Sequence, residues 1–147
     1  MADEKEPAHE PDRAPATLSQ VLGEVVFLMT MPQSHKFLFL ADLEWLVMPP
    51  LGLRQFRLWR QGQQPVAFAS WAFLSDEAQE RAVAGVRRLR PSDWKSGDHA
   101  WLMDVVAPNA EFAQKMVEEL KRDVFAGRTL KGLRPRPQGG GSEVVDL

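Results

Sequence analysis

Residues 54–75, with the sequence RQFRLWRQGQQPVAFASWAFLS, decide the fold class of this chain. Apolar and charged side chains alternate over residues 54–61, which is the pattern of a half-buried strand. A polar turn at residues 61–64 leads into residues 65–74, a second segment rich in aromatic and small apolar side chains. Together these segments predict an antiparallel β-hairpin.

The sequence on either side of the hairpin predicts helices that pack on a small sheet. Apolar residues recur at spacings of three and four over residues 17–30, where Thr17 can serve as the N-cap. Ser75 can cap a second helix, with Arg87 and Arg88 in its last turn. The remaining predicted elements are a strand over residues 101–107, a helix over residues 108–125 and an edge strand over residues 129–137. The chain is therefore expected to be an α+β domain with a small, mainly antiparallel sheet flanked by helices.

Composition divides the chain into a body and two ends. Residues 1–15 hold five acidic residues, two basic residues and three prolines, which predicts a disordered acidic tail. Residues 16–137 form the expected domain, and the glycine-rich residues 138–147 are predicted to be a flexible tail. Within the body, Pro49 and Pro50 are expected to end an apolar segment over residues 37–48.

Charge and cysteine content narrow the function classes. The chain has 147 residues, no cysteine and a formal net charge of -2, so disulfides, thiolate metal sites and a cysteine nucleophile are excluded. An overall basic field for nucleic acid is absent, and the longest apolar run, residues 25–29, is far short of the ~20 residues that span a bilayer. We therefore expect no nucleic-acid partner, no stable membrane insertion, no metal and a cytoplasmic protein.

Two single residues are candidates for chemistry. His35 lies in a short polar segment after the first predicted helix, where its imidazole could act as a general base or could simply be a surface histidine. Asp104 lies within the predicted third strand, where alternation places it on one face with Leu102 and Val106. A carboxylate in that setting either orients a histidine or lies on a solvated face of an edge strand.

Residues 121–136 form a basic segment with six basic residues and one acid. Such a segment is either a solvated face or a docking surface for an acidic partner. A glycine-rich phosphate loop is absent from the sequence.

Two sequence blocks resemble the lysine acyltransferases that activate RTX (repeats-in-toxin) protoxins. Residues 64–75, QPVAFASWAFLS, are similar to the Pro-Val-Ala-x-x-Ser-Trp-Ala-x-Leu-Ser block of that family. Residues 93–98, DWKSGD, followed by residues 101–108, WLMDVVAP, are similar to its second block. The resemblance extends over roughly residues 20–137.

The resemblance implies a fold similar to the GNAT acyltransferases and transfer of a fatty acyl group from acyl carrier protein to internal lysines of an RTX-type protoxin. It places His35 and Asp104 at the positions of the family's catalytic histidine and aspartate. No further cofactor is implied, and a homodimer is suggested. The chain departs from the family pattern at Pro32, which replaces a serine three residues before the histidine, while Ser34 lies next to His35.

The acyl transfer that this resemblance implies needs further groups. A main-chain N–H near Trp71 is one hypothesis for stabilising the oxyanion. Candidate residues for binding substrate or carrier are Ser34, Ser70, Trp71, Lys121, Arg122 and Arg128. The alternative is a catalytically silent adaptor with a GNAT-like fold that binds a protein partner, and the missing phosphate loop disfavours an acetyl-CoA-dependent enzyme.

Overall fold

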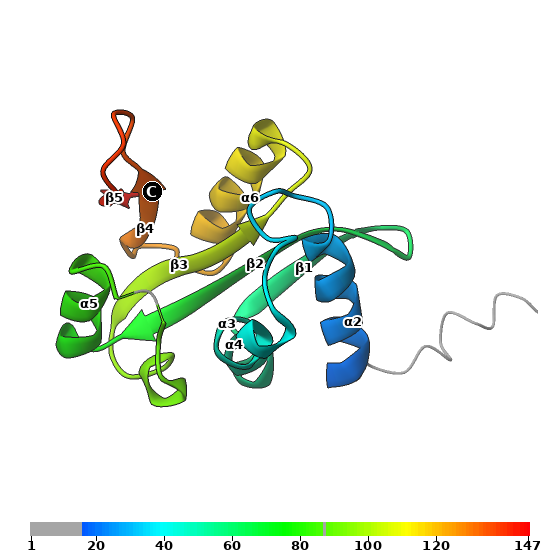
Figure 1. Ribbon diagram of the computed structural model, residues 1–147, viewed down its shortest axis with the longest axis horizontal. Coiled ribbons are helices and arrows are strands. Elements are labelled where there is room, and N and C mark those ends of the chain that lie inside the picture. Colours follow the sequence, from blue (N-terminus) through cyan, green and yellow to red (C-terminus); the bar gives the residue numbers. More distant parts are fainter. Residues whose placement is uncertain (1–15, 87) are drawn as a thin grey trace, which may run out of the picture.

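A five-stranded open sheet organises the computed structural model, which describes residues 16–86 and 88–147 (Figure 1). The strands follow the order β1 (Phe56–Gln61), β2 (Gln64–Leu74), β3 (His99–Val106), β4 (Leu130–Pro135) and β5 (Ser142–Asp146). All neighbouring strands are antiparallel except β3 and β4. The predicted hairpin and the mainly antiparallel α+β class are confirmed, whereas similarity to the GNAT fold stays a prediction.

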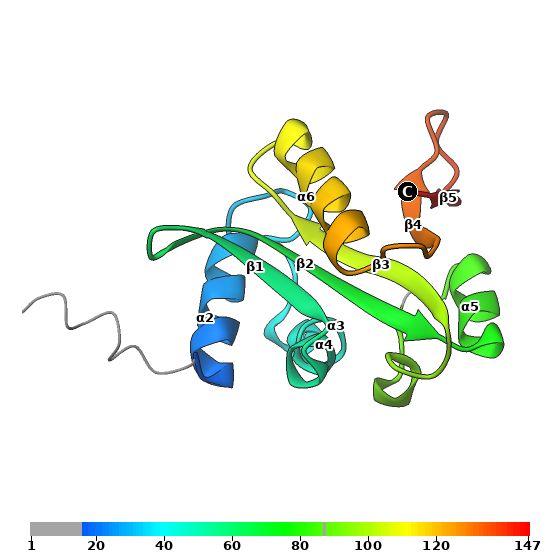
Figure 2. The same ribbon diagram turned by 180° about the vertical axis from the view of Figure 1, so that it is seen from behind.

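Helices cover both faces of this sheet. In chain order they are α2 (Leu18–Met29), η2 (Leu40–Asp42), α3 (Leu43–Leu46), α4 (Met48–Leu53), α5 (Asp76–Val83), η3 (Pro91–Asp93) and α6 (Ala110–Asp123). Both views place α6 on one side of the strands and α3 and α4 on the other (Figures 1 and 2). No helix of residues 16–86 and 88–147 combines the length and apolar character needed to cross a bilayer.

Each face of the sheet has its own apolar core. Helices α2 and α4 pack against Phe68 and Val106 on one face. On the other face, α6 packs against alternate residues of β2, including Ala69 and Trp71. A third cluster joins α5 to Trp94 and to the start of β3. The alternation of β2 between the two cores explains why this strand reads as almost continuously apolar.

The predicted caps of two helices are confirmed. The Thr17 side chain accepts a hydrogen bond from the Gln20 amide, and the Gln20 side chain accepts one from the Thr17 amide. This reciprocal capping box fixes the start of α2. The Ser75 side chain accepts from the Ala78 amide at the start of α5. Local side-chain chemistry thus sets both starting points.

Two helix boundaries differ from prediction. Helix α5 ends at Val83 and does not reach Arg88, because Gly85 takes a φ of 100° and breaks the helical path. Helix α4 contains Pro49 and Pro50 in its first turn, where an amide N–H has no helical acceptor to lose. The apolar segment therefore continues through the two prolines into α4, while α3 ends at Leu46.

The C-terminal residues form a strand, which corrects the prediction of a flexible tail over residues 138–147. Strand β5 pairs with β4 over residues 131–146, so β4 is an interior strand and not an edge. Lys131 pairs with Asp146 and Arg134 with Glu143 across this hairpin. Three glycines with positive φ, residues 139–141, make the turn between the strands. The acidic tail over residues 1–15 lies outside the described residues.

The second block of the family resemblance builds a structural junction. Trp94 is 1% exposed, and its carbonyl accepts hydrogen bonds from the Phe73 amide and the Gln55 side chain. The Asp93 carboxylate binds the Arg81 guanidinium through two hydrogen bonds, which hold the pKa of Asp93 well below its usual range. A Cβ at Gly97 would lie 2.6 Å from the Leu74 carbonyl oxygen, so only glycine fits there.

Candidate active site

His35 lies in the loop between α2 and η2, on the α2 side of the sheet. The Pro32 carbonyl accepts hydrogen bonds from the amides of His35 and Lys36, which closes a tight turn directly after the helix. This turn directs the imidazole toward β3, where Nε2 of His35 lies 2.7 Å from Oδ1 of Asp104. Both side chains are 11% exposed. The structure thus joins the two residues that the sequence singled out.

A β-bulge aims Asp104 at this histidine. Ser70 pairs with Asp104 and Trp71 pairs with Leu102, so Met103 is an extra residue in β3. Because of this insertion, Met103 and Asp104 lie on one face, while Leu102 packs partly against the core under α6. The prediction that Leu102 shares a face with Asp104 is wrong for this reason.

The hydrogen bonds of the imidazole define its tautomer. An ionised carboxylate only accepts, so Nε2 of His35 carries the proton donated to Asp104. Nδ1 of His35 then accepts from the Ser34 hydroxyl at 2.7 Å. Ser34 is exposed, whereas His35 and Asp104 lie behind it. The basic nitrogen therefore faces the accessible side of the pair.

Electrostatics strengthen His35 as a base. The hydrogen bond to Asp104 raises the pKa of His35 above its ordinary value, and burial of the ring opposes this rise only in part. Oδ1 of Asp104 also accepts from the Val105 amide at 3.0 Å, which fixes the carboxylate. The second oxygen, Oδ2, is buried and has no hydrogen-bond partner among the described residues.

A largely apolar pocket of about 440 Å³ adjoins the three polar side chains. Ser34, His35 and Asp104 line it together with apolar residues from α3, α5, β3 and β4, including Trp45, Leu46, Ala82, Val86, Met103 and Leu133. Strands β3 and β4 pair only at Ala100 with Leu130 and at Trp101 with Lys131. Leu133 reaches the pocket from β4 beyond these paired positions. An imidazole beside an apolar pocket is suited to a substrate with a polar end and a long apolar part.

Ser70 and Trp71 do not line this pocket. Ser70 is fully buried, directly opposite Asp104 in register, and its hydroxyl has no partner among the described residues. The Trp71 ring packs against Phe125 on the α6 side of the sheet. Its amide donates to the Gln55 carbonyl, so this particular N–H is occupied, and an oxyanion donor elsewhere near Trp71 stays a prediction.

The predicted basic segment is partly neutralised, and its α6 part lies away from His35, whereas β4 contributes Leu133 to the pocket. Lys121 and Arg122 extend from α6, which covers the opposite face of the sheet, and Arg122 pairs with Asp123. Arg128 donates to the Asp98 carbonyl and lies over the Phe73 ring. The acids of β5 pair with further basic residues of β4. Acidic partners in the fold therefore neutralise part of the positive charge of residues 121–136.

A second histidine–aspartate pair provides a comparison. Nε2 of His99 lies 2.6 Å from Oδ1 of Asp76, so His99 does not pair with its neighbour Asp98. The His99 and Asp76 side chains are 37% and 88% exposed. Water competes for this pair, and neither residue lines the pocket beside His35. The pair therefore lacks the setting of a catalytic base.

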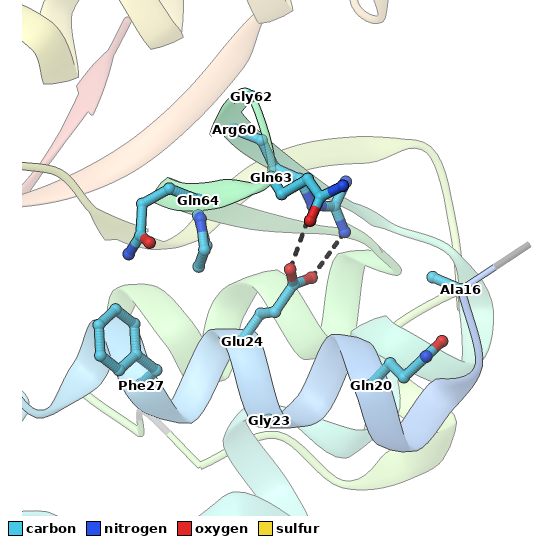
Figure 3. Close-up of a pocket in the computed structure, with 10 residues that line it drawn as sticks. Ala16, Gln20, Gly23, Glu24, Phe27, Arg60, Gly62, Gln63 and Gln64 are labelled. Carbon is cyan, nitrogen blue, oxygen red and sulfur yellow. Dashed lines mark hydrogen bonds and ion pairs between the residues drawn. The ribbon is translucent and has the colours of Figure 1, made fainter. Parts of the chain in front are cut away.

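A further hollow of about 780 Å³ lies between α2 and the β1–β2 turn (Figure 3). Its main polar contact is a two-point ion pair in which Arg60 donates to Glu24, with the shorter bond at 2.6 Å. The side chains that line it hold no histidine or hydroxyl nucleophile. This hollow therefore lacks the imidazole and the hydroxyl that line the pocket beside His35.

Comparison with known proteins identifies the family. A profile of the RTX toxin acyltransferase family matches residues 14–147. The chain belongs to this family. It is an acyltransferase, as the resemblance implied.

Three lysine acyltransferases are about one third identical to this chain. The chain is 33% identical over 113 residues to the lysine-acyltransferase RtxC of Vibrio cholerae, which covers 75% of this chain and 72% of the relative. It is 32% identical over 128 residues to the RTX-I toxin-activating lysine-acyltransferase ApxIC of Actinobacillus pleuropneumoniae, covering 87% and 73%. It is 32% identical over 113 residues to the protein-lysine myristoyltransferase RtxC of Kingella kingae, covering 77% and 66%.

The sequence of this acyltransferase did not predict part of the pocket. Trp45 and Leu46 belong to the apolar segment over residues 37–48, to which no role was assigned. Arg88 lies 5.4 Å from the centre of the Trp45 ring and was expected only as a helix-terminal residue. An apolar segment that follows directly on a candidate base was the available signal for the pocket.

Proposed function

We propose that this protein transfers a fatty acyl group from acyl carrier protein to lysine ε-amines of an RTX-type protoxin, with His35 as the general base and Asp104 as its partner. The observation that carries the proposal is the 2.7 Å contact between His35 and Asp104 beside an apolar pocket. The relatives are lysine acyltransferases and toxin activators by name, which supports a lysine of an RTX-type protoxin as the acyl acceptor.

The acceptor amine explains the need for a base. A lysine side chain is protonated near neutral pH and becomes a nucleophile only after it loses a proton. Nδ1 of His35 points away from Asp104 and can take that proton. Asp104 then stabilises the imidazolium that forms, through the hydrogen bond already made to Nε2.

The pocket supports a fatty acyl group as the transferred unit. Its apolar lining removes hydrocarbon from water, and each buried methylene contributes about 0.8 kcal/mol. The volume of about 440 Å³ lies within the range of small-molecule sites. An acyl chain held against Leu46 and Met103 would leave its carbonyl carbon near the His35 ring.

The start of α6 favours a carrier protein over a free coenzyme A donor. Between Val106, the last residue of β3, and Ala110, the first of α6, lie only Ala107, Pro108 and Asn109. The Asn109 side chain itself occupies the first turn by accepting from Phe112. This short connection has no glycine-rich loop to cradle a pyrophosphate.

The test measures the mass of an RTX-type target after incubation with this protein and one of two donors. Myristoyl acyl carrier protein is expected to add one acyl group to a target lysine, and myristoyl-coenzyme A is expected to react far more slowly. Equal rates with both donors would overturn the carrier requirement. Binding of the target without any mass gain would favour the silent adaptor, against which the assembled His35–Asp104 pair argues.

A further inference from the structure

We propose that Ser34 is a nucleophile that carries the acyl group as an ester before the lysine receives it. This inference rests on the proposed function and adds a covalent intermediate to it. Ser34, His35 and Asp104 form a continuous chain of hydrogen bonds, at 2.7 Å between Ser34 and His35 and 2.7 Å between His35 and Asp104. A hydroxyl, an imidazole and a carboxylate in this order are the parts of an activated serine.

Along this series of hydrogen bonds, exposure to solvent increases from Asp104 and His35 to Ser34, as a nucleophile requires. Asp104 and His35 are each 11% exposed, whereas Ser34 is exposed and lines the apolar pocket. An incoming thioester therefore meets the hydroxyl first, and the carboxylate stays shielded from water. The His35 ring accepts from the Ser34 hydroxyl through Nδ1, the nitrogen that does not hold the proton shared with Asp104.

The Ser34 hydroxyl also has no structural task in the described part of the chain. Its hydrogen bond to His35 is the one that this hydroxyl makes there. By contrast, the Ser75 hydroxyl caps α5 by accepting from Ala78, and the Ser96 hydroxyl bridges the Asp93 carbonyl and the Ser75 amide. A serine whose hydroxyl contacts only a largely buried histidine thus differs from serines that cap helices or bridge turns.

The reaction balances without any further reagent. In the first half, Oγ of Ser34 attacks the thioester carbonyl while Nδ1 of His35 takes the hydroxyl proton. The C–S bond breaks, and His35 returns that proton to the departing thiolate, which leaves as the carrier thiol. In the second half, the lysine amine attacks the Ser34 ester and gives a proton to His35. The C–O bond then breaks, and the Ser34 oxygen regains its proton as the amide is released.

The experiment uses the full chain, myristoyl acyl carrier protein as probe and no lysine acceptor. Rapid acid quenching and intact-mass measurement are expected to reveal one myristoyl group on the enzyme, together with one equivalent of released thiol. Peptide mapping should locate the group on Ser34. Ser34→Ala should lose both the adduct and the thiol burst and should slow lysine transfer by about 100-fold or more. Gln33→Ala, which alters the neighbouring exposed residue, should keep all three.

Two results would overturn the inference and leave the proposed function standing. A myristoyl group mapped to His35 would assign the intermediate to the imidazole. Full lysine transfer by Ser34→Ala, with no adduct on the wild type, would indicate direct transfer from carrier to lysine. If the wild-type protein transfers no acyl group to any acceptor and releases no thiol, both the inference and the proposed function fail.

Discussion

Nε2 of His35 lies 2.7 Å from Oδ1 of Asp104, although 69 positions separate the two residues in the chain. A turn after α2 supplies the histidine, and a bulge in β3 supplies the aspartate. The contact therefore depends on the docking of α2 against the sheet, and it forms only when both halves of the domain are folded. Catalysis in this account is a property of the assembled fold.

Replacing Asp104 by asparagine removes the charge and keeps the side-chain shape. Asp104→Asn is expected to lower kcat for lysine acylation by about 10²- to 10⁴-fold, because the imidazolium loses its counter-charge and its fixed tautomer. Asp76→Asn is the matched control, since Asp76 makes the same type of contact with the exposed His99. Steady-state kinetics of the two variants measure the difference. Equal activities would contradict the assignment of Asp104.

The pH profile should report the His35–Asp104 contact. A base works when it is neutral, and the hydrogen bond to Asp104 raises the pKa of His35, so kcat/KM should fall with decreasing pH at a midpoint above the ordinary histidine value. In Asp104→Asn this midpoint should move to lower pH. A profile in which both proteins share one midpoint would mean that another group is the base.

The raised pKa of His35 also makes folding stability depend on pH, and this dependence runs opposite to that of activity. Because folding raises the pKa of His35, the contact stabilises the fold fully below the unfolded value, and this contribution is lost as pH rises through the folded value. The difference in Tm between wild type and Asp104→Asn should therefore be larger on the acidic side of this window. Thermal unfolding at a series of pH values measures it, and a difference that grows with pH would contradict the sign.

Chain-length preference should follow the volume of the pocket. Val86 lines the pocket, so Val86→Trp should lower transfer of a myristoyl group by about tenfold and affect an octanoyl group less. Val83 is 58% exposed at the end of α5 and does not line the pocket, which makes Val83→Trp the control. Competition between the two donors provides the measurement. Unchanged preference in Val86→Trp would place the acyl chain elsewhere.

Docking of the carrier should depend on charge beside the pocket and not on α6. Arg88 is exposed and lies over the pocket residue Trp45. Carrier proteins are acidic, so Arg88→Glu is expected to raise the carrier KM by about fivefold, with a smaller effect at high salt. Arg122→Glu changes the same charge on the far face and should leave KM unchanged. The reverse result would restore the basic segment over residues 121–136 as the docking surface.

Local patterns predicted the elements of this fold well, and contacts between distant residues account for what they missed. The hairpin and the capped starts of α2 and α5 depend on neighbours in sequence, and the structure confirms them. The bulge at Met103 depends on the partner strand, so no local pattern reports it. The glycine run at residues 139–141 predicts a flexible tail by its composition, but in the structure it is the turn that joins β4 to β5.

The candidate site was predictable in its parts but not in its assembly. A histidine after a helix and an aspartate within a strand each had a structural alternative, and only the family resemblance joined them. The pocket could not be predicted from the sequence, because residues of α3, α5, β3 and β4 line it and these elements meet only in the folded chain. The sequence places Ser34 next to His35, but the hydrogen bond between their side chains depends on the turn closed by Pro32.

The most direct test of the central claim compares two histidine variants in one acylation assay. His35→Ala and His99→Ala each remove an imidazole that contacts an aspartate, yet only His35 adjoins the apolar pocket. The intact mass of an RTX-type target, incubated with myristoyl acyl carrier protein, gives the readout. We expect full acylation with His99→Ala and none above background with His35→Ala. Acylation by His35→Ala at the wild-type rate would contradict the account.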